Sequence, residues 1–205
     1  MSSSEKAGSP YEGTPESKWE SVTRRLVRQH PLQTAEIVDV VRIAWDGIFA
    51  TRIANFQIGV DIEPQPQIMG FLLHELIPLE FQRRYPEEWR GQRTKFEKDL
   101  VYKTDLVKSV EIKTSSHKSQ VFGNRSYAKA AKNGEIGRKG KSGYFLTINF
   151  EKFGNSNRPE LRIIRFGWLD HVDWIAQASE TGQQSHVRTE AYKHKLITIF
   201  ENGSK

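Results

Sequence analysis

Apolar residues recur at helical spacing in three segments of the first half of the chain. Their spacing predicts an amphipathic helix over Glu16–Gln29 and a second over Thr34–Ile53, whose buried stripe is Ile37, Val41, Ala44 and Ile48. A third helix is predicted from about Gln67 to Arg84, with a buried face formed by Ile68, Leu72, Leu76 and Leu79. Pro78 is expected to kink or break this helix, because proline lacks an N–H donor and its ring clashes with the preceding turn.

The second half of the chain carries shorter apolar runs, which are typical of β-strands. The predicted strands are Leu100–Tyr102, Val107–Thr114, Tyr144–Phe150, Leu161–Phe166 and Lys195–Phe200. The first two flank a short polar segment and are expected to form a hairpin, and Asn133–Gly143 reads as a flexible basic loop. Asp170 is expected to cap a short helix that runs through Trp174 and Ala178. Helices and strands together indicate an α/β fold.

Length and composition favour one domain. The 205 residues suffice for one well-buried core, which we expect over residues 16–205, after a Ser-, Gly- and Pro-rich arm over residues 1–15 that is expected to be poorly ordered, with Tyr11 as its candidate anchor. No apolar run is long enough to span a membrane, and no secretory signal pattern is seen. The absence of cysteine excludes disulfides, thiolate metal sites and a thiol nucleophile, and fits a cytoplasmic protein.

The net charge of +6 and the pI near 9.5 favour a polyanionic partner. Basic residues concentrate at Arg83–Arg93, Lys103–Lys118 and Lys129–Lys141, with acidic residues interspersed in the first two clusters. A solvated surface explains each cluster equally well. Charge alone therefore leaves nucleic-acid binding open.

Two carboxylates and a lysine meet in the predicted hairpin. Alternation along its second strand sends Val110 and Ile112 to the core. Glu111 and Lys113 then project from the other face, and the turn is expected to place Asp99 opposite Glu111. Directly opposed side chains lie about 4.5–5.5 Å apart at Cβ, so two carboxylates would repel unless a cation lay between them.

Mg²⁺ suits such a pair, because it prefers oxygen ligands and usually binds one or two carboxylates plus substrate phosphate oxygens. Asp99 and Glu111 are therefore the candidate metal ligands. Lys113 is expected to position or activate the attacking water and to stabilise developing negative charge. Glu97 shares the strand face of Asp99 and would replace it if the register differed. Alternatively, all of these are ordinary surface residues of a strand.

The third helix adds a further carboxylate. Glu75 is expected on or beside the apolar face, where a buried carboxylate would either help to hold the metal or make a structural hydrogen bond. Glu80 is its competitor and is expected to be a solvated charge. His74 and His171 are expected to be core or capping residues, because no second His or Cys stands at metal spacing.

Polar side chains suited to DNA follow the active strand and recur near the C-terminus. Hydroxyl and ammonium groups suit phosphate contacts, and amide or guanidinium groups can read base edges in the major groove. The candidates are Ser115, Ser116, Lys118, Gln120, Asn124, Arg125, Ser126, Gln183 and Gln184. Residues of these types are equally common in polar loops that cap helices.

Asp99 followed by Glu111-Ile112-Lys113 resembles the PD-(D/E)XK nuclease pattern, with Lys98 in place of the usual proline. Longer segments resemble the ScaI family of type II restriction endonucleases: SPYEG (9–13), QIMGF (67–71), HELIPLEF (74–81), EIKTSS (111–116), QVFGNRSY (120–127) and FGWLD (166–170). The resemblance implies a restriction-endonuclease-like α/β core, with a central mixed sheet flanked by helices. It also implies a homodimer that cuts double-stranded DNA with Mg²⁺ at a short palindrome, AGTACT being the first candidate.

In PD-(D/E)XK nucleases a glutamate on a helix before the motif often helps to hold the metal, and Glu75 matches that position. A restriction enzyme also implies a cognate DNA methyltransferase, which protects the host. Two other functions fit the same residues: a repair or junction-resolving nuclease of this fold, and a non-catalytic DNA-binding module. An RNA-binding role fits the pI but leaves the paired acids unexplained.

Overall fold

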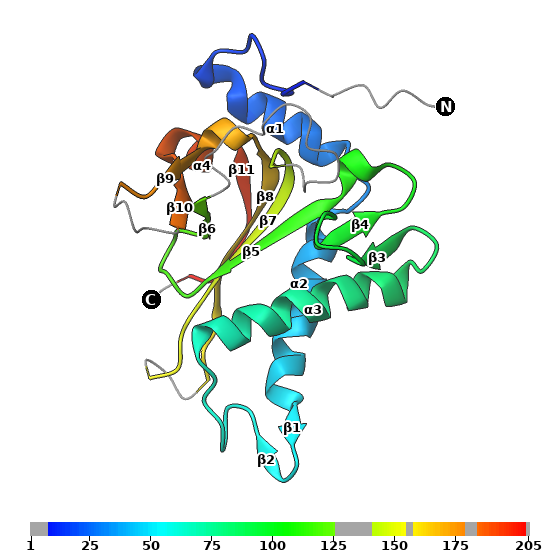
Figure 1. Cartoon of the computed structure of the whole chain (residues 1–205), viewed down its shortest axis with the longest axis vertical. Coiled ribbons are helices and arrows are strands. Elements are labelled where there is room, and N and C mark those ends of the chain that lie inside the picture. The colour runs from blue at the N-terminus through cyan, green and yellow to red at the C-terminus, as the bar shows by residue number, and fades with distance from the viewer. Residues whose placement is uncertain (1–7, 126–140, 155–157, 179–183, 204–205) are drawn as a thin grey trace.

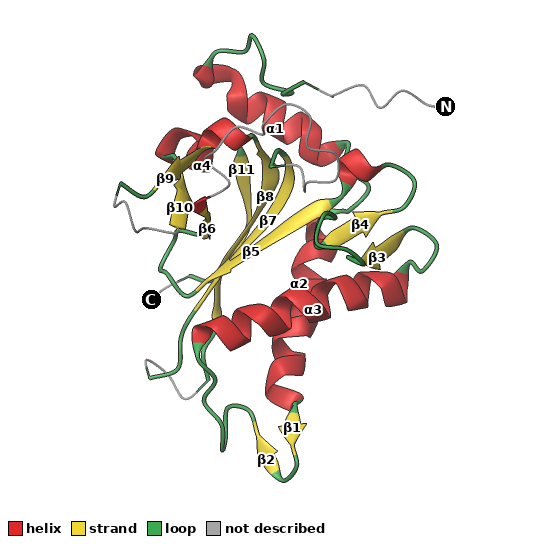
Figure 2. Ribbon diagram, in the orientation of Figure 1, coloured by secondary structure: helices red, strands yellow, loops and turns green. Residues whose placement is uncertain are grey.

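A six-stranded mixed β-sheet forms the centre of the structure, with the three longer helices on one face and a small three-stranded sheet together with a short helix on the other (Figure 1). The computed structural model describes residues 8–125, 141–154, 158–178 and 184–203. The α-helices within these ranges are α1 (Trp19–Arg28), α2 (Thr34–Ala50), α3 (Pro66–Arg84) and α4 (Thr189–His194) (Figure 2). Short 3-10 helices span Glu16–Lys18, Leu106–Lys108 and His171–Asp173. The strands are β1 (Arg52–Ile53), β2 (Phe56–Gln57), β3 (Trp89–Gly91), β4 (Leu100–Tyr102), β5 (Val110–Ser115), β6 (Phe122–Asn124), β7 (Gly143–Phe150), β8 (Leu161–Leu169), β9 (Trp174–Ala176), β10 (Gln184–Val187) and β11 (Leu196–Glu201).

The strand order of the large sheet is β11-β8-β7-β5-β4-β3. Neighbouring strands pair antiparallel except β5 and β7, which run parallel. β6 follows β5 in sequence but joins the small sheet, whose order is β6-β10-β9. The expected α/β fold with a central mixed sheet is confirmed, and β5 lies inside that sheet with a strand on each side.

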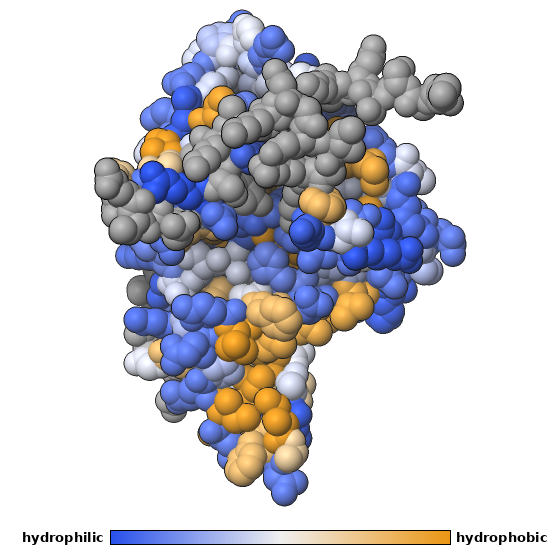
Figure 3. Space-filling view, in the orientation of Figure 1, coloured by the Kyte–Doolittle hydropathy of each residue, from blue (hydrophilic) through white to orange (hydrophobic). Residues whose placement is uncertain are grey.

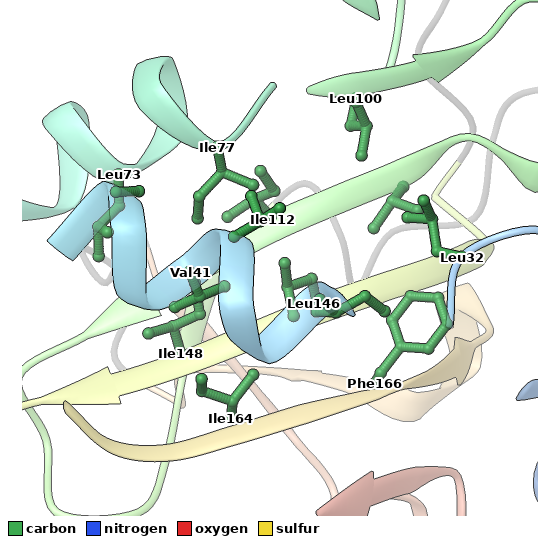
Figure 4. Close-up of a cluster of buried hydrophobic side chains, with 14 of the residues drawn as sticks. Leu32, Val41, Leu73, Ile77, Leu100, Ile112, Leu146, Ile148, Ile164 and Phe166 are labelled. Atoms are coloured by element: carbon green, nitrogen blue, oxygen red, sulfur yellow. The ribbon is translucent and has the colours of Figure 1, made fainter. Parts of the chain in front are cut away.

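The main hydrophobic core lies between the helices and one face of the sheet (Figure 4). All four residues of the predicted α2 stripe are buried, so this prediction is confirmed. The sheet contributes alternate residues of its strands, including Ile112, Leu146 and Ile164. All eight residues of β7 are buried, as expected for a strand that is covered on both faces. None of the helices in the described ranges is long and apolar enough to cross a membrane.

Helix α3 differs from its prediction in two respects. Its buried face is Met69, Leu73, Ile77 and Phe81, one or two positions after the predicted residues. Two of the predicted core residues, Ile68 and Leu79, are 51% and 56% exposed. Because α3 carries apolar residues on more than one side, spacing alone does not select the face that packs on α2 and the sheet. The helix also continues through Pro78, which is buried, so the proline does not break it. The preceding helix, by contrast, is shorter than predicted and ends at Ala50.

Four of the five predicted strands are found within a few residues of their expected bounds. The fifth, over Val107–Thr114, starts later, because Asp105 accepts a hydrogen bond from the Val107 N–H (3.0 Å) and caps a 3-10 turn. Asp170 caps a helix as predicted, but only a 3-10 turn over His171–Asp173. The expected continuation to Ala178 is wrong, because β9 begins at Trp174 and pairs with β10. Most of the predicted basic loop, residues 133–140, lies outside the described residues.

Part of the N-terminal segment packs against the domain. The side chain of Tyr11 is 4% exposed, and its hydroxyl lies 2.8 Å from Thr23 Oγ1. Ser9 donates a hydrogen bond of 2.7 Å to the Asp170 carboxylate. Residues 1–7 lie outside the described part of the chain. From Ser9 on, the segment expected to be a poorly ordered arm is therefore held in place, with Tyr11 as its anchor.

Candidate active site

The register of the β4–β5 hairpin decides which acids meet. Leu100 pairs with Val110, which is the predicted register and puts Asp99 at the position opposite Glu111. Both carboxylates are buried, with Asp99 7% and Glu111 2% exposed. Asp99 Oδ2 accepts a hydrogen bond of 2.7 Å from the backbone N–H of Ile112. The first acid is thereby attached directly to the strand that carries the second.

The side chains of β5 alternate between the two faces of the sheet, as predicted. Val110 and Ile112 are buried in the main core, whereas Glu111 and Lys113 project from the opposite face of the sheet. Lys113 Nζ donates a hydrogen bond of 2.5 Å to Glu111 Oε1. The structure therefore places two carboxylates and an ammonium group around one short stretch of β5.

The donor chemistry of this group fits a hard divalent cation. Both acids offer carboxylate oxygens, and they lie in a buried setting where uncompensated negative charge is costly. Among the described residues, no group of three or more His, Cys, Asp or Glu side chains could hold a metal ion. A pair of carboxylates is a protein ligand set that leaves room for water and substrate oxygens around a divalent cation.

His74 of α3 lies beside the acids, with Nδ1 3.6 Å from Asp99 Oδ2. It is partly exposed and is not a core residue, so the interpretation of His74 as core or capping is wrong. Sequence reasoning missed it because the phase of α3 was assigned one residue too early. The sequence contains one indication of the true orientation of α3, the glycine at position 70, one turn before His74. The structure shows why a glycine lies there, because a Cβ would come within 2.6 Å of Thr114 Oγ1 on β5. His171 is the first residue of the 3-10 turn that Asp170 caps, so its interpretation as a core or capping residue stays a prediction.

Glu75 is exposed, so its expected burial is wrong. The cause is again the rotation of α3, which turns Leu73 and Ile77 to the core and Glu75, midway between them, away from it. The carboxylate does face a cleft at the end of β5, described below. Glu75 therefore borders the candidate site without being part of its buried group.

Glu80 and Glu97, the two alternative candidates for the site, form ion pairs with arginines instead. Glu80 forms ion pairs with Arg83 (2.7 Å) and Arg84 (2.9 Å), and the hydrogen bond from Arg83 is the main cause that lowers the pKa of Glu80 to about 2. Glu97 pairs with Arg90 at 2.6 Å, and this contact lowers the pKa of Glu97 to about 2. The Glu80 side chain is only 13% exposed, so Glu80 is an ion-paired charge rather than the solvated one that was predicted. The confirmed register leaves Glu97 outside the group around Glu111.

A cleft of about 790 Å³ opens next to these residues, between α3 and the end of β5. His74 and Glu75 form one wall, and Phe122 of β6 and Gln184 of β10 lie on the other side. Its remaining lining residues are Pro66, Gln67, Gly70, Phe71, Gln92, Thr114, Ser115, Ser116, His117 and Lys152. Because His74 contacts Asp99 and also lines the cleft, the acids adjoin a space that is open to a substrate.

The predicted DNA contacts are brought together only in part. Ser115, Ser116 and Gln184 line the cleft, and Gln184 pairs with Asn124 across β6 and β10, although the two are distant in sequence. Lys118 and Gln120 are exposed on the segment between β5 and β6, and Arg125 follows β6. Ser126 and Gln183 lie outside the described residues.

Nearly the whole chain is similar to one family of DNA-cutting enzymes. It matches the family model described as ScaI restriction endonuclease over residues 9–200. It is 46% identical over 200 residues to the Type II restriction enzyme ScaI of Streptomyces caespitosus, an alignment that covers 96% of this chain and 87% of the relative. No solved structure matches the chain. The chain therefore belongs to the ScaI restriction endonuclease family and is a site-specific deoxyribonuclease.

Proposed function

We propose that this endonuclease hydrolyses a phosphodiester bond in each strand of double-stranded DNA, at a short palindromic site and with Mg²⁺, using Asp99, Glu111 and Lys113. The observation that carries the proposal is the meeting of these side chains on one face of β5, with Asp99 opposite Glu111 and Lys113 hydrogen-bonded to Glu111. Their order matches the PD-(D/E)XK pattern. We therefore assign residues 16–205 to a single domain of that class.

Asp99 and Glu111 would hold the cation. When bound, Mg²⁺ would polarise the scissile phosphate and lower the pKa of a coordinated water. The backbone N–H of Ile112 keeps the Asp99 carboxylate oriented, and Lys113 keeps that of Glu111 in place. The Lys113 ammonium, which contacts Glu111, would orient the attacking water and stabilise the negative charge that develops on the phosphate.

The cleft supplies the surface for DNA. Ser115 and Ser116 offer hydroxyl donors to phosphate oxygens next to the acids, and Glu75 assists the metal from the α3 wall. The amide and cationic side chains of Lys118, Gln120, Asn124, Arg125 and Gln184 extend this surface toward the small sheet. Their chemistry suits base and phosphate contacts in the major groove.

A homodimer is part of the proposal, because a two-fold symmetric enzyme matches a palindrome and brings one active centre to each strand. Exposed apolar side chains gather over α3 and the β1–β2 hairpin (Figure 3), and include Ile53, Phe56, Val60, Ile68 and Phe71. Phe71 also lines the cleft, so a second copy bound there would lie near the active centre. A DNA methyltransferase of the same specificity would protect host DNA in the cytoplasm.

Digestion of one plasmid of known sequence tests the proposal. Discrete fragments that require Mg²⁺ and disappear with a chelator are expected, and sequencing of their ends gives the target and the stagger. Nicking confined to branched or damaged DNA would instead favour a repair or junction-resolving nuclease. DNA binding without cleavage under all metal conditions would favour a non-catalytic module.

A further inference from the structure

A group of polar side chains lies beneath the segment 116–121, which links β5 to β6. Asn149 of β7 is fully buried, and its Nδ2 donates hydrogen bonds to the carbonyl oxygens of His117 (3.0 Å) and Gln120 (2.9 Å). The hydroxyl of Tyr192, on α4, donates to the carbonyl oxygen of Ser119 (2.6 Å). Arg165 of β8 joins them, because its Nη1 donates to Asn149 Oδ1 (3.1 Å), to the Tyr192 hydroxyl (3.1 Å) and to Ser119 O (3.3 Å). We call Asn149, Arg165 and Tyr192 the polar platform.

The setting of Arg165 is unusual for an arginine. Burial lowers the pKa of its guanidinium, and the group lies 4.7 Å from the centre of the Tyr192 ring. Within the described part of the chain, Arg165 makes no salt bridge, and the acceptors of its hydrogen bonds are neutral. Partly buried charge is costly unless it is well hydrogen-bonded, so the fold retains this arginine as a donor to the platform and to Ser119.

The polar platform continues the catalytic face of the sheet. In the strand register, Lys113 pairs with Thr147, and Thr147 pairs with Arg165. Ser115 pairs with Asn149 in the same way. Arg165 therefore lies in the same row of the sheet as Lys113, and Asn149 lies in the next row on that face, beside Ser115.

Segment 116–121 carries three of the proposed DNA contacts. Ser116 lines the cleft, and Lys118 and Gln120 are exposed. The carbonyl oxygens of this segment point to the polar platform, while its remaining backbone contacts are local: the N–H groups of Ser119 and Gln120 both donate to His117 Nδ1. The polar platform, together with the fully buried side chain of Val121, thus fixes the segment to the sheet.

We propose that Asn149, Arg165 and Tyr192 are positioning residues for sequence discrimination, because they set where segment 116–121 meets the DNA. This inference rests on the proposed function. Base readout depends on side chains held within about 0.5 Å of their productive geometry, so a loosened segment costs contacts to the correct base pair more than it costs the chemistry. Loss of one platform hydrogen bond is expected to lower the preference for the correct site by roughly tenfold.

Tyr192→Phe is the sharpest variant, because it keeps the ring beside Arg165 and removes only the hydroxyl. Tyr85→Phe is the matched control, since the Tyr85 hydroxyl bonds to Glu36 on the outer surface, away from segment 116–121. Arg165→Lys is a second variant, which keeps the charge but not the fork of donors. Initial cleavage rates are measured on two duplexes, one with the site mapped for the wild type and one with a single base pair exchanged. Hydrogen exchange of peptides that cover residues 116–121 is followed in parallel.

We expect Tyr192→Phe and Arg165→Lys to lower the ratio of the two rates roughly tenfold and to speed exchange in segment 116–121, with little change for Tyr85→Phe. An unchanged ratio in both variants, with a wild type that cuts at discrete sites, overturns the inference and leaves the proposed function standing. A wild type that does not cut at discrete sites overturns both. Equal loss of both rates without faster exchange also overturns the inference, because it indicates a purely structural or catalytic effect.

Discussion

Asp99 Oδ2 lies 2.7 Å from the backbone nitrogen of Ile112 and accepts its hydrogen bond. Ile112 stands between Glu111 and Lys113, with its own side chain buried in the core. One carboxylate oxygen therefore closes the β4–β5 hairpin, while the acid as a whole belongs to the candidate metal site. The stability of the fold should therefore depend on the hydrogen-bond acceptor of this side chain, and activity on its negative charge.

Asp99→Asn and Asp99→Ala are expected to separate these two roles. The amide oxygen of Asn still accepts from the Ile112 N–H, so unfolding stability should change little, whereas Ala leaves a buried donor without its acceptor and should cost about 1–3 kcal/mol. Both variants lack the negative charge and should lose Mg²⁺-dependent cleavage. Thermal unfolding and cleavage rates measured side by side check this, and full activity of Asp99→Asn would rule out a metal-binding role.

Glu75 is expected to assist the metal without being essential. Because its carboxylate is exposed on the cleft wall, Glu75→Gln should raise the Mg²⁺ concentration needed for half-maximal cleavage and leave the rate at saturating Mg²⁺ within about tenfold of wild type. Glu80→Gln, on the same helix, is the control, since its carboxylate is occupied by Arg83 and Arg84. Identical Mg²⁺ dependence of both variants would assign Glu75 a structural role.

The contact between α3 and β5 depends on the absence of a side chain at Gly70. A Cβ there would come within 2.6 Å of Thr114 Oγ1, so Gly70→Ala should destabilise the protein by about 1–3 kcal/mol through overpacking. Thr114→Ala removes the clashing oxygen, and the double variant should recover most of the loss. Denaturant unfolding of the two single variants and the double variant measures the coupling, and strictly additive effects would contradict the contact.

His30 should make the fold sensitive to acid. Its ring packs 4.4 Å from that of Tyr144, its Nε2 lies 2.8 Å from the Lys108 carbonyl oxygen, and its Nδ1 accepts from the Leu32 N–H. Burial lowers its pKa from 6.5 to about 4. Because the unfolded chain then binds the proton more tightly than the folded one, this stability is present above the unfolded pKa and is lost as the pH falls through the range from 6.5 to about 4.

The expected loss is about 2–3 kcal/mol between about pH 7 and about pH 4.5. His30→Gln removes the titrating ring and should be less stable at neutral pH, but with a flatter dependence on pH. Denaturant unfolding at several pH values compares the two. Parallel curves for wild type and variant would show that His30 does not contribute to the acid sensitivity.

The β4–β5 hairpin could be predicted from the sequence because its signals are local. The polar turn fixes the register, and the period of two along Val110–Lys113 fixes the faces, so the positions of Asp99 and Glu111 follow. The helix α3 could not be oriented in this way. It has apolar residues around much of its circumference, and its rotation is decided by packing against α2 and β5, as the close approach of Gly70 to Thr114 illustrates.

The small sheet β6-β10-β9 could also not be predicted from local sequence patterns. Its strands have three or four residues, and two of its members, Asn124 and Gln184, come together only through pairing across a long stretch of chain. The polar platform under segment 116–121 has the same origin, since Asn149, Arg165 and Tyr192 come from three different elements. Such contacts depend on tertiary structure, which a single sequence does not reveal by spacing.

Cleavage of a single-site DNA by wild type, Glu111→Gln and Glu97→Gln tests the assignment of the catalytic centre most directly. The two variants make the same chemical change in neighbouring acids, one beside Lys113 and the other paired with Arg90. With saturating Mg²⁺ and comparable folding, Glu111→Gln is expected to cut roughly a thousandfold more slowly than wild type, and Glu97→Gln at nearly the wild-type rate. Cleavage by Glu111→Gln at the wild-type rate would contradict the assignment.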